Sequence, residues 1–213
     1  MPKKKLKRFA EIATFPHVIQ MLTDLRGSWH RDFFHNDNPI TLELACGKGE
    51  YTVAMAQMYP ERNFVGVDLK GARMWTGAKA ALNLKLANVA FLRMPIERIA
   101  DCFGTDEVAE IWITFPDPFL SQCRAKKRLT SPDFISLYRR ILRPGGLIHL
   151  KTDEPNLFAY TQKVVTNCGA QLVDKVDDVY GSSTENQLLK IQTAYEKRHL
   201  EDNRTIRYLS FHL

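Results

Sequence analysis

The sequence predicts an α/β protein with a doubly wound, mostly parallel sheet. From residue 40 onward, short apolar runs alternate with amphipathic segments of helical length, which is typical of a parallel sheet covered by helices. The first apolar run breaks at Gly47 and Gly49, and a helical pattern follows. A strand, a glycine turn and a helix are the usual place where such a sheet binds a nucleotide-sized ligand. At 213 residues, the chain is long enough for one such domain with a full core.

Five buried strands are predicted from the apolar runs at 40–45, 64–67, 89–92, 111–115 and 147–150. A sixth strand is expected near 172–179, and a last one, antiparallel to its neighbours, at 205–211. Helical spacing follows the first strand near Val53 and recurs between the later strands, at 70–87, near 96–103, from Ser131 to Leu142, up to Asn167 and at 189–200.

The N-terminal segment has a different composition. Residues 1–10 are basic and are expected to form a mobile arm, and the spacing of apolar residues predicts a helix over 9–25, interrupted near Pro16. We therefore divide the chain into a basic arm with a helical extension, 1–38, and a single α/β domain, 39–213.

Composition limits the classes of protein that need to be considered. Hydrophobic residues make up 45% and charged residues 25%, as in ordinary soluble proteins, and no window has the apolar length of a membrane span. The four cysteines are scattered without a C-x-x-C pair, so we expect free thiols in a reducing cytoplasm and no metal site. The net charge of +6 is compatible with a polyanionic partner, and it concentrates in 3–8 and 124–128.

The glycine turn carries acids where a dinucleotide site would not. Glu43 precedes the turn, Asp68 ends the next strand, and Thr52 stands where the G-x-G-x-x-G pattern has its third glycine. Two carboxylates repel a pyrophosphate but suit a ligand with an amino group, a sulfonium and a ribose. S-adenosylmethionine is therefore the expected cofactor, with a dinucleotide as the alternative.

Acidic residues recur at the ends of the predicted strands. Because ligands bind beyond the carboxyl ends of parallel strands, we expect these acids to gather at one site. They are Glu43, Asp68, Glu97, Asp117 and Asp153.

The sequence resembles the bacterial tRNA (guanine-N7-)-methyltransferases from about Ile40 to the C-terminus. The shared motifs are Phe-Pro-Asp-Pro at 115–118, Lys-Arg-Leu-Thr at 127–130, Pro-Gly-Gly at 144–146, Thr-Asp at 152–153 and Thr-Ala-Tyr-Glu at 193–196. The resemblance implies a Rossmann-like methyltransferase sheet and methylation of a guanosine in the variable loop of tRNA. It also implies that Glu43, Asp68 and Asp117 contact the cofactor, with Asp117 at the catalytic centre. Asp153, Thr193, Tyr195 and Glu196 are implied to hold the target guanosine.

The chain departs from the family pattern at two positions. The family usually has an aspartate where this chain has Pro95, so either Glu97 supplies an acid to the adenine or only backbone contact remains. The family's substrate-contacting lysine falls on Ser121, and Arg124, Lys126 and Lys127 are the candidates to replace it.

The expected chemistry needs no catalytic base, because guanine N7 carries a lone pair and no proton. A carboxylate beside the base would stabilise the cationic product, and we assign this role to Asp117. Glu196 could accept hydrogen bonds from guanine N1–H and N2–H₂, an edge that adenine lacks. The basic run 124–128 suits phosphate contact. Another S-adenosylmethionine-dependent methyltransferase and a non-catalytic tRNA-binding module remain the alternatives. We expect the protein to be a monomer or a homodimer.

Overall fold

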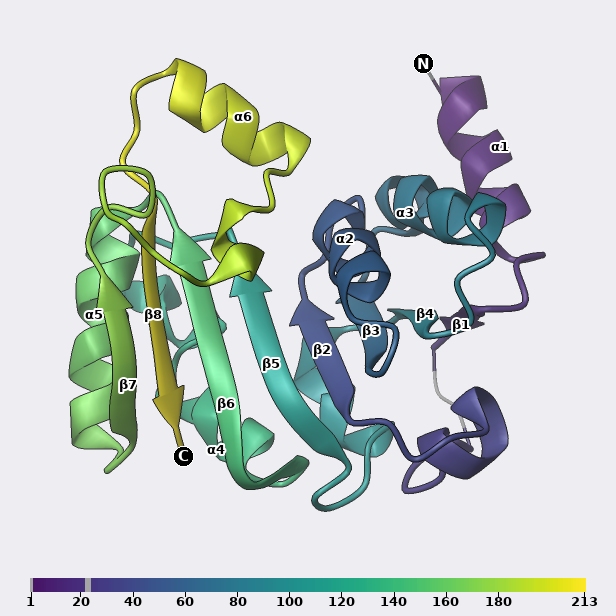
Figure 1. Ribbon diagram of the computed structural model, residues 1–213, viewed down its shortest axis with the longest axis horizontal. Helices are drawn as coiled ribbons and strands as arrows, with labels where there is room; N and C mark the ends of the chain where they lie inside the picture. The colour runs from purple at the N-terminus through teal and green to yellow at the C-terminus, as the bar shows by residue number, and fades with distance from the viewer. Residues whose placement is uncertain (1, 22–23) are drawn as a thin grey trace.

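The computed structural model describes residues 2–21 and 24–213. In this part of the chain, eight strands form one sheet in the order β1-β4-β3-β2-β5-β6-β8-β7 (Figure 1). The strands are β1 (Val18–Gln20), β2 (Ile40–Leu44), β3 (Asn63–Asp68), β4 (Val89–Arg93), β5 (Val108–Thr114), β6 (Leu142–Thr152), β7 (Gln171–Val176) and β8 (Arg207–His212). The predicted doubly wound sheet is confirmed: β8 runs antiparallel to both β6 and β7, and the other strand pairs are parallel.

Helices cover both faces of the sheet. The α-helices are α1 (Pro2–Ile12), α2 (Glu50–Met58), α3 (Gly71–Asn83), α4 (Pro132–Tyr138), α5 (Pro155–Asn167) and α6 (Ala194–Glu201). Four shorter helical segments are η1 (Trp29–Phe34), η2 (Ile96–Asp101), η3 (Gln122–Lys127) and η4 (Gln187–Lys190).

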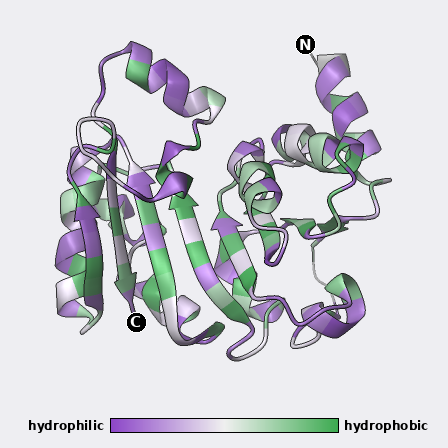
Figure 2. Cartoon of the chain, in the orientation of Figure 1, coloured by the Kyte–Doolittle hydropathy of each residue, from purple (hydrophilic) through white to green (hydrophobic). Residues whose placement is uncertain are grey.

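Two hydrophobic cores lie on the two sides of the sheet. One is formed with α4, α5, η1 and η2, and includes Phe134, Phe158 and Trp29. The other is formed with α1, α2 and α3, and includes Tyr51 and Met74. The strands between them are buried on both faces, which explains why β2, β3 and β5 appear in the sequence as continuous apolar runs rather than as alternating patterns. Figure 2 shows this hydrophobic interior and a largely hydrophilic α6.

The N-terminal prediction was right about helix at 9–12 but wrong about where the helix begins and ends. Instead of a mobile arm followed by a helix over 9–25, the structure has helix α1 at Pro2–Ile12 and strand β1 at Val18–Gln20. Strand β1 pairs in parallel with β4 at the sheet edge, so sheet hydrogen bonds override the helical spacing there. Leu22 and Thr23 of the predicted helix lie outside the described residues. The division of the chain at 38 and 39 stays a prediction.

The site is positioned by the direction of the strands. Strands β2, β5 and β6 point the same way, and α6 lies beyond their carboxyl ends (Figure 1).

Within the described residues, no helix combines the length and the apolar character needed to cross a membrane.

Candidate active site

The turn after β2 needs glycine for steric reasons. Gly49 begins α2 with φ +71°, and a Cβ there would collide with the ring of Phe91. Gly77, in the middle of α3, faces the same turn: its Cβ would lie 2.6 Å from the carbonyl oxygen of Lys48. The two glycines let α3 pack directly against the turn. Gly49 could be identified from the sequence, but Gly77 could not, because its partner is 28 residues away in the chain.

Asp68 holds the turn through backbone amides. Its Oδ2 accepts from the Gly47 N–H at 2.9 Å, and its Oδ1 accepts from the Lys70 N–H at 2.7 Å. Because each carboxylate oxygen has a second lone pair, Asp68 can still accept hydrogen bonds from a ligand diol.

Glu43 lies just beneath the turn and is buried. Its Oε2 accepts from the backbone N–H and the hydroxyl of Thr52, and its Oε1 accepts from the Thr114 hydroxyl at 2.8 Å. Burial raises the pKa of Glu43 to about 7, against the lowering effect of these hydrogen bonds. Glu43 therefore ties the start of α2 to the end of β5 in addition to facing the cavity.

Asp117 follows β5 and is exposed, between the buried Pro116 and the partly buried Pro118. The turn starts from Phe115, which has φ +47°, and Ala45 at the end of β2 has φ +58°. Such left-handed conformations are strained for residues with a Cβ and are typical of functional sites. They turn the chain sharply at two adjacent strand ends.

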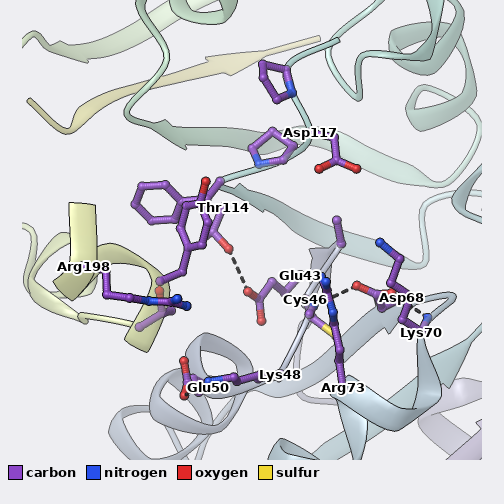
Figure 3. Close-up of a pocket in the computed structure, with 17 residues that line it drawn as sticks. Glu43, Cys46, Lys48, Glu50, Asp68, Lys70, Arg73, Thr114, Asp117 and Arg198 are labelled. Atoms are coloured by element: carbon purple, nitrogen blue, oxygen red, sulfur yellow. Dashed lines mark hydrogen bonds and ion pairs between the residues drawn. The ribbon is translucent and has the colours of Figure 1, made fainter. Parts of the chain in front are cut away.

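These strand ends surround a cavity of about 490 Å³, a size suited to a nucleoside-sized ligand (Figure 3). Six of the predicted site residues line it: Glu43, Gly47, Asp68, Asp117, Thr193 and Tyr195. The other predicted residues lie outside its lining: Gly49, Glu97, Asp153, Glu196, Arg124, Lys126 and Lys127. Glu97 is exposed in η2, and its contact with adenine stays a prediction.

The Thr-Ala-Tyr-Glu motif begins α6. Thr193 caps the helix by accepting the Glu196 N–H at 3.2 Å, as in half of a capping box. Glu196 itself is fully buried: its Oε1 lies 2.6 Å from Lys151 Nζ and accepts from the Tyr180 hydroxyl at 2.8 Å. Burial raises the pKa of Glu196 and lowers the pKa of Lys151. In this structure Glu196 anchors α6 to the sheet, and guanine recognition by Glu196 stays a prediction.

Tyr195 lines the cavity and contacts two other aromatic rings. Its ring centroid is 5.5 Å from that of Phe115 and 4.0 Å from that of His199. His199 Nδ1 lies 2.7 Å from Asp153 Oδ2, and this oxygen also accepts a hydrogen bond from Arg204 at 2.9 Å. Asp153, predicted to contact guanosine, is thus engaged by His199 of α6 and by Arg204 in the segment after that helix.

The basic run divides into two kinds of residue. Arg124, Lys126 and Lys127 are exposed on η3, as phosphate contact requires. Arg128 is buried: its guanidinium donates to the carbonyls of residues 118–120 and stacks 4.2 Å from the ring centroid of Tyr160. It shapes the loop after Asp117.

Several charged residues in the cavity wall were not predicted from the sequence. These are Lys48, Glu50, Lys70, Arg73 and Arg198. For Arg198 a signal existed, because it follows Tyr195 by three residues and so shares its helix face. Among the described residues, no three histidine, cysteine, aspartate or glutamate side chains are grouped as a metal site would require.

Comparison with solved structures places this fold among the methyltransferases. The 16S rRNA methyltransferase KamB aligns with a TM-score of 0.67 at 17% identity, covering 90% of this chain and 94% of that one. A variant of the 16S rRNA (adenine(1408)-N(1))-methyltransferase from Catenulisporales acidiphilia with cosubstrate SAM aligns with a TM-score of 0.58 at 16% identity, covering 89% and 92%. A family profile described as "Putative methyltransferase" matches residues 37–209. This profile covers most of the chain and shows that the chain belongs to a methyltransferase family, whose fold the strand-end cavity fits.

Closer relatives specify which one. The tRNA (guanine-N(7)-)-methyltransferase of Porphyromonas gingivalis is 52% identical over 211 residues, covering 94% of this chain and 86% of that protein. The chain belongs to the tRNA (guanine-N(7)-)-methyltransferase family.

Proposed function

We propose that the protein transfers the methyl group of S-adenosylmethionine to N7 of a guanosine in tRNA, in the variable loop, in the cytoplasm. One observation carries this proposal: a single cavity joins the acids of the glycine turn, Glu43 and Asp68, to the exposed carboxylate of Asp117 and the ring of Tyr195. A cofactor half and a nucleobase half thus meet at the ends of β2, β3 and β5.

The residues of the glycine turn fit S-adenosylmethionine. Asp68 is held by two backbone amides at the end of β3, where a ribose diol can donate to its remaining lone pairs. A Cβ on Gly47 would meet only the Ala45 carbonyl, at 3.9 Å, so the backbone there is open to close approach by a ligand. When bound, S-adenosylmethionine supplies a methyl group on a positively charged sulfur, which suits the carboxylates of Glu43, Asp68 and Asp117 in the cavity wall.

The nucleobase half needs to orient N7 and to stabilise positive charge. Well-oriented reactants gain roughly 7–11 kcal/mol in model systems, without any proton transfer. Asp117 stands between two prolines, which restrict its backbone, and its carboxylate can stabilise the charge that develops on the base. The rings of Tyr195 and Phe115 offer the base a flat apolar contact.

The test is transfer of labelled methyl groups to bulk tRNA, followed by nucleoside analysis of the product. We expect the label in 7-methylguanosine. Label in another nucleoside would assign the chain to a different RNA methyltransferase activity, and tRNA binding without transfer would identify a non-catalytic module.

A further inference from the structure

Arg198 has no role in the chemistry described so far, although it lines the cavity. It extends from α6 into the cavity, opposite the wall that carries Asp68, Lys70 and Arg73 (Figure 3). Its Nε donates to the Ala194 carbonyl at 3.3 Å, within the same helix. None of the carboxylates in the described part of the chain lies within 4.0 Å of its guanidinium, whereas Arg204 is paired with Asp153.

The helix that carries Arg198 is fixed at its N-terminal end. The Ala194 N–H donates to Glu50 Oε2 at 2.8 Å, and Glu196 is joined to Lys151 inside the protein. The guanidinium therefore projects from a rigid support, and among the described residues no carboxylate competes with an anion for its terminal amino groups. An arginine in this state is suited to bind phosphate through two parallel hydrogen bonds.

The position of Arg198 relative to Tyr195 indicates which phosphate it meets. The two residues are three apart on α6, so their side chains are neighbours on one helix face, and both line the cavity. A backbone phosphate beside a base stacked on the Tyr195 ring would be within reach of a side chain on this helix face. We infer that Arg198 binds the phosphodiester at the target guanosine while Tyr195 stacks on its base. This inference rests on the proposed function and adds a substrate contact to it.

The first test compares Arg198→Ala and Arg198→Lys with Lys197→Ala. Lys197 precedes Arg198 on α6 and is exposed, but it does not line the cavity, so it is a matched control for loss of one positive charge. Arg198→Ala should raise KM for tRNA on the order of ten- to a hundredfold, the effect of losing hydrogen bonds to a charged group. Arg198→Lys should recover part of this loss, and Lys197→Ala should stay close to wild type.

Two further readouts separate a phosphate contact from a cofactor contact and from a loss of stability. The slope of log KM against log salt should fall by about 0.7–0.9 in Arg198→Ala, because one fewer counterion is released. Binding of S-adenosylmethionine by calorimetry and the melting temperature should be unchanged. Weakened S-adenosylmethionine binding with normal KM for tRNA would overturn the inference and assign Arg198 to the cofactor carboxylate.

The decisive test neutralises single phosphates in the RNA. Synthetic tRNA carries one methylphosphonate linkage on the 5′ or the 3′ side of the target guanosine, or at a remote site. One adjacent linkage should lower kcat/KM for the wild-type enzyme and have little further effect on Arg198→Ala, whereas the remote linkage should affect both enzymes equally. Independent effects at both adjacent linkages would refute the contact. Failure of the wild-type enzyme to form any 7-methylguanosine would instead refute the proposed function.

Discussion

At the scale of single residues, the strand ends place carboxylates in contrasting environments. Glu43 is buried and fully hydrogen-bonded, Asp68 accepts from two backbone amides, and Asp117 is exposed at the cavity. The first two are held by hydrogen bonds within the protein, so they shape the turn as well as facing the cavity. Asp117 makes no side-chain hydrogen bond within the described residues, which leaves its charge available to a substrate.

Asp117→Asn keeps the shape of this side chain and removes its charge. We expect kcat to fall about 10²-fold, as for removal of one electrostatic contact to a transition state, with a smaller effect on KM for tRNA. Steady-state kinetics measures the fall in kcat. The control is Asp133→Asn, which changes an exposed carboxylate outside the cavity. An unchanged kcat would remove Asp117 from the catalytic centre.

Glu196→Gln distinguishes two roles of Glu196: guanine recognition, which the sequence predicts, and anchoring of α6 through Lys151, which the structure shows. With the buried Lys151 charge left unpaired, the free energy of unfolding should fall by about 3 kcal/mol, and kcat/KM should fall because α6 is displaced. Denaturant unfolding and kinetics are measured together, with Tyr180→Phe as a variant that removes only the neutral hydrogen bond to Glu196. Loss of kcat/KM at full stability would show that Glu196 reads guanine directly, as the sequence predicted.

At the scale of elements, η3 and the loop before it form one unit. The Arg128 guanidinium donates hydrogen bonds to the backbone carbonyls of residues 118–120 and so holds this loop in place. Lys126 and Lys127 on η3 face solvent. The basic run is therefore both a support for the turn that carries Asp117 and a charged surface beside it. Substitution of the whole run would mix these two effects.

The double variant Lys126→Ala/Lys127→Ala tests the charged surface alone. KM for tRNA should rise and its salt dependence should flatten, because fewer counterions are released, while the free energy of unfolding stays near wild type. Arg128→Ala is the contrasting variant: it should lower stability by about 1–3 kcal/mol through the unsatisfied carbonyls. An unaltered salt slope in the double variant would mean that η3 is only a solvated surface.

At the scale of the whole molecule, a buried polar network crosses the sheet from β5 through β6 to β8. Glu110 on β5 pairs with Arg62 and lies 2.8 Å from His149 Nε2 on β6, and His149 Nδ1 is 2.8 Å from the Tyr208 hydroxyl on β8. Although burial acts to raise it, hydrogen bonding and charge from His149 and Arg62 lower the pKa of Glu110 to about 2. The network thus joins three strands through one ionised carboxylate.

This network predicts how stability depends on pH. Because the folded-state pKa of Glu110 lies below its ordinary 4.5, its carboxylate contributes stability above pH 4.5, and that contribution is lost as pH falls toward about 2. The contribution is on the order of 3 kcal/mol. Denaturant unfolding is measured between pH 2 and 7. The free energy of unfolding should fall less steeply with decreasing pH for Glu110→Gln than for wild type or for Glu61→Gln, a control at an exposed carboxylate. An equal loss of unfolding free energy at low pH in all three proteins would mean that other groups cause the pH dependence.

The sequence by itself determined the elements whose signals are local. Continuous apolar runs specified β2 to β5, because a strand covered by helices on both faces must be apolar throughout. Glu43, Asp68 and Asp117 could be found because each directly borders a strand end, and parallel strands bring such ends together. The three residues of β1 are too few to show a period, so their strand conformation depended on pairing with β4.

Only the tertiary structure decided which polar side chains face the cavity and which support it. Thr193, Tyr195 and Glu196 adjoin in the sequence, yet Tyr195 faces the cavity whereas Glu196 turns inward to Lys151, which is 45 residues away. Arg128 and Lys127 are likewise neighbours with opposite exposures. The amino-acid composition of a charged run is the same whether a given side chain in it is buried or exposed. The burial of each charge depends on partners brought together by the packing of α6 and the loop after β5 against the sheet, and those partners leave no local pattern.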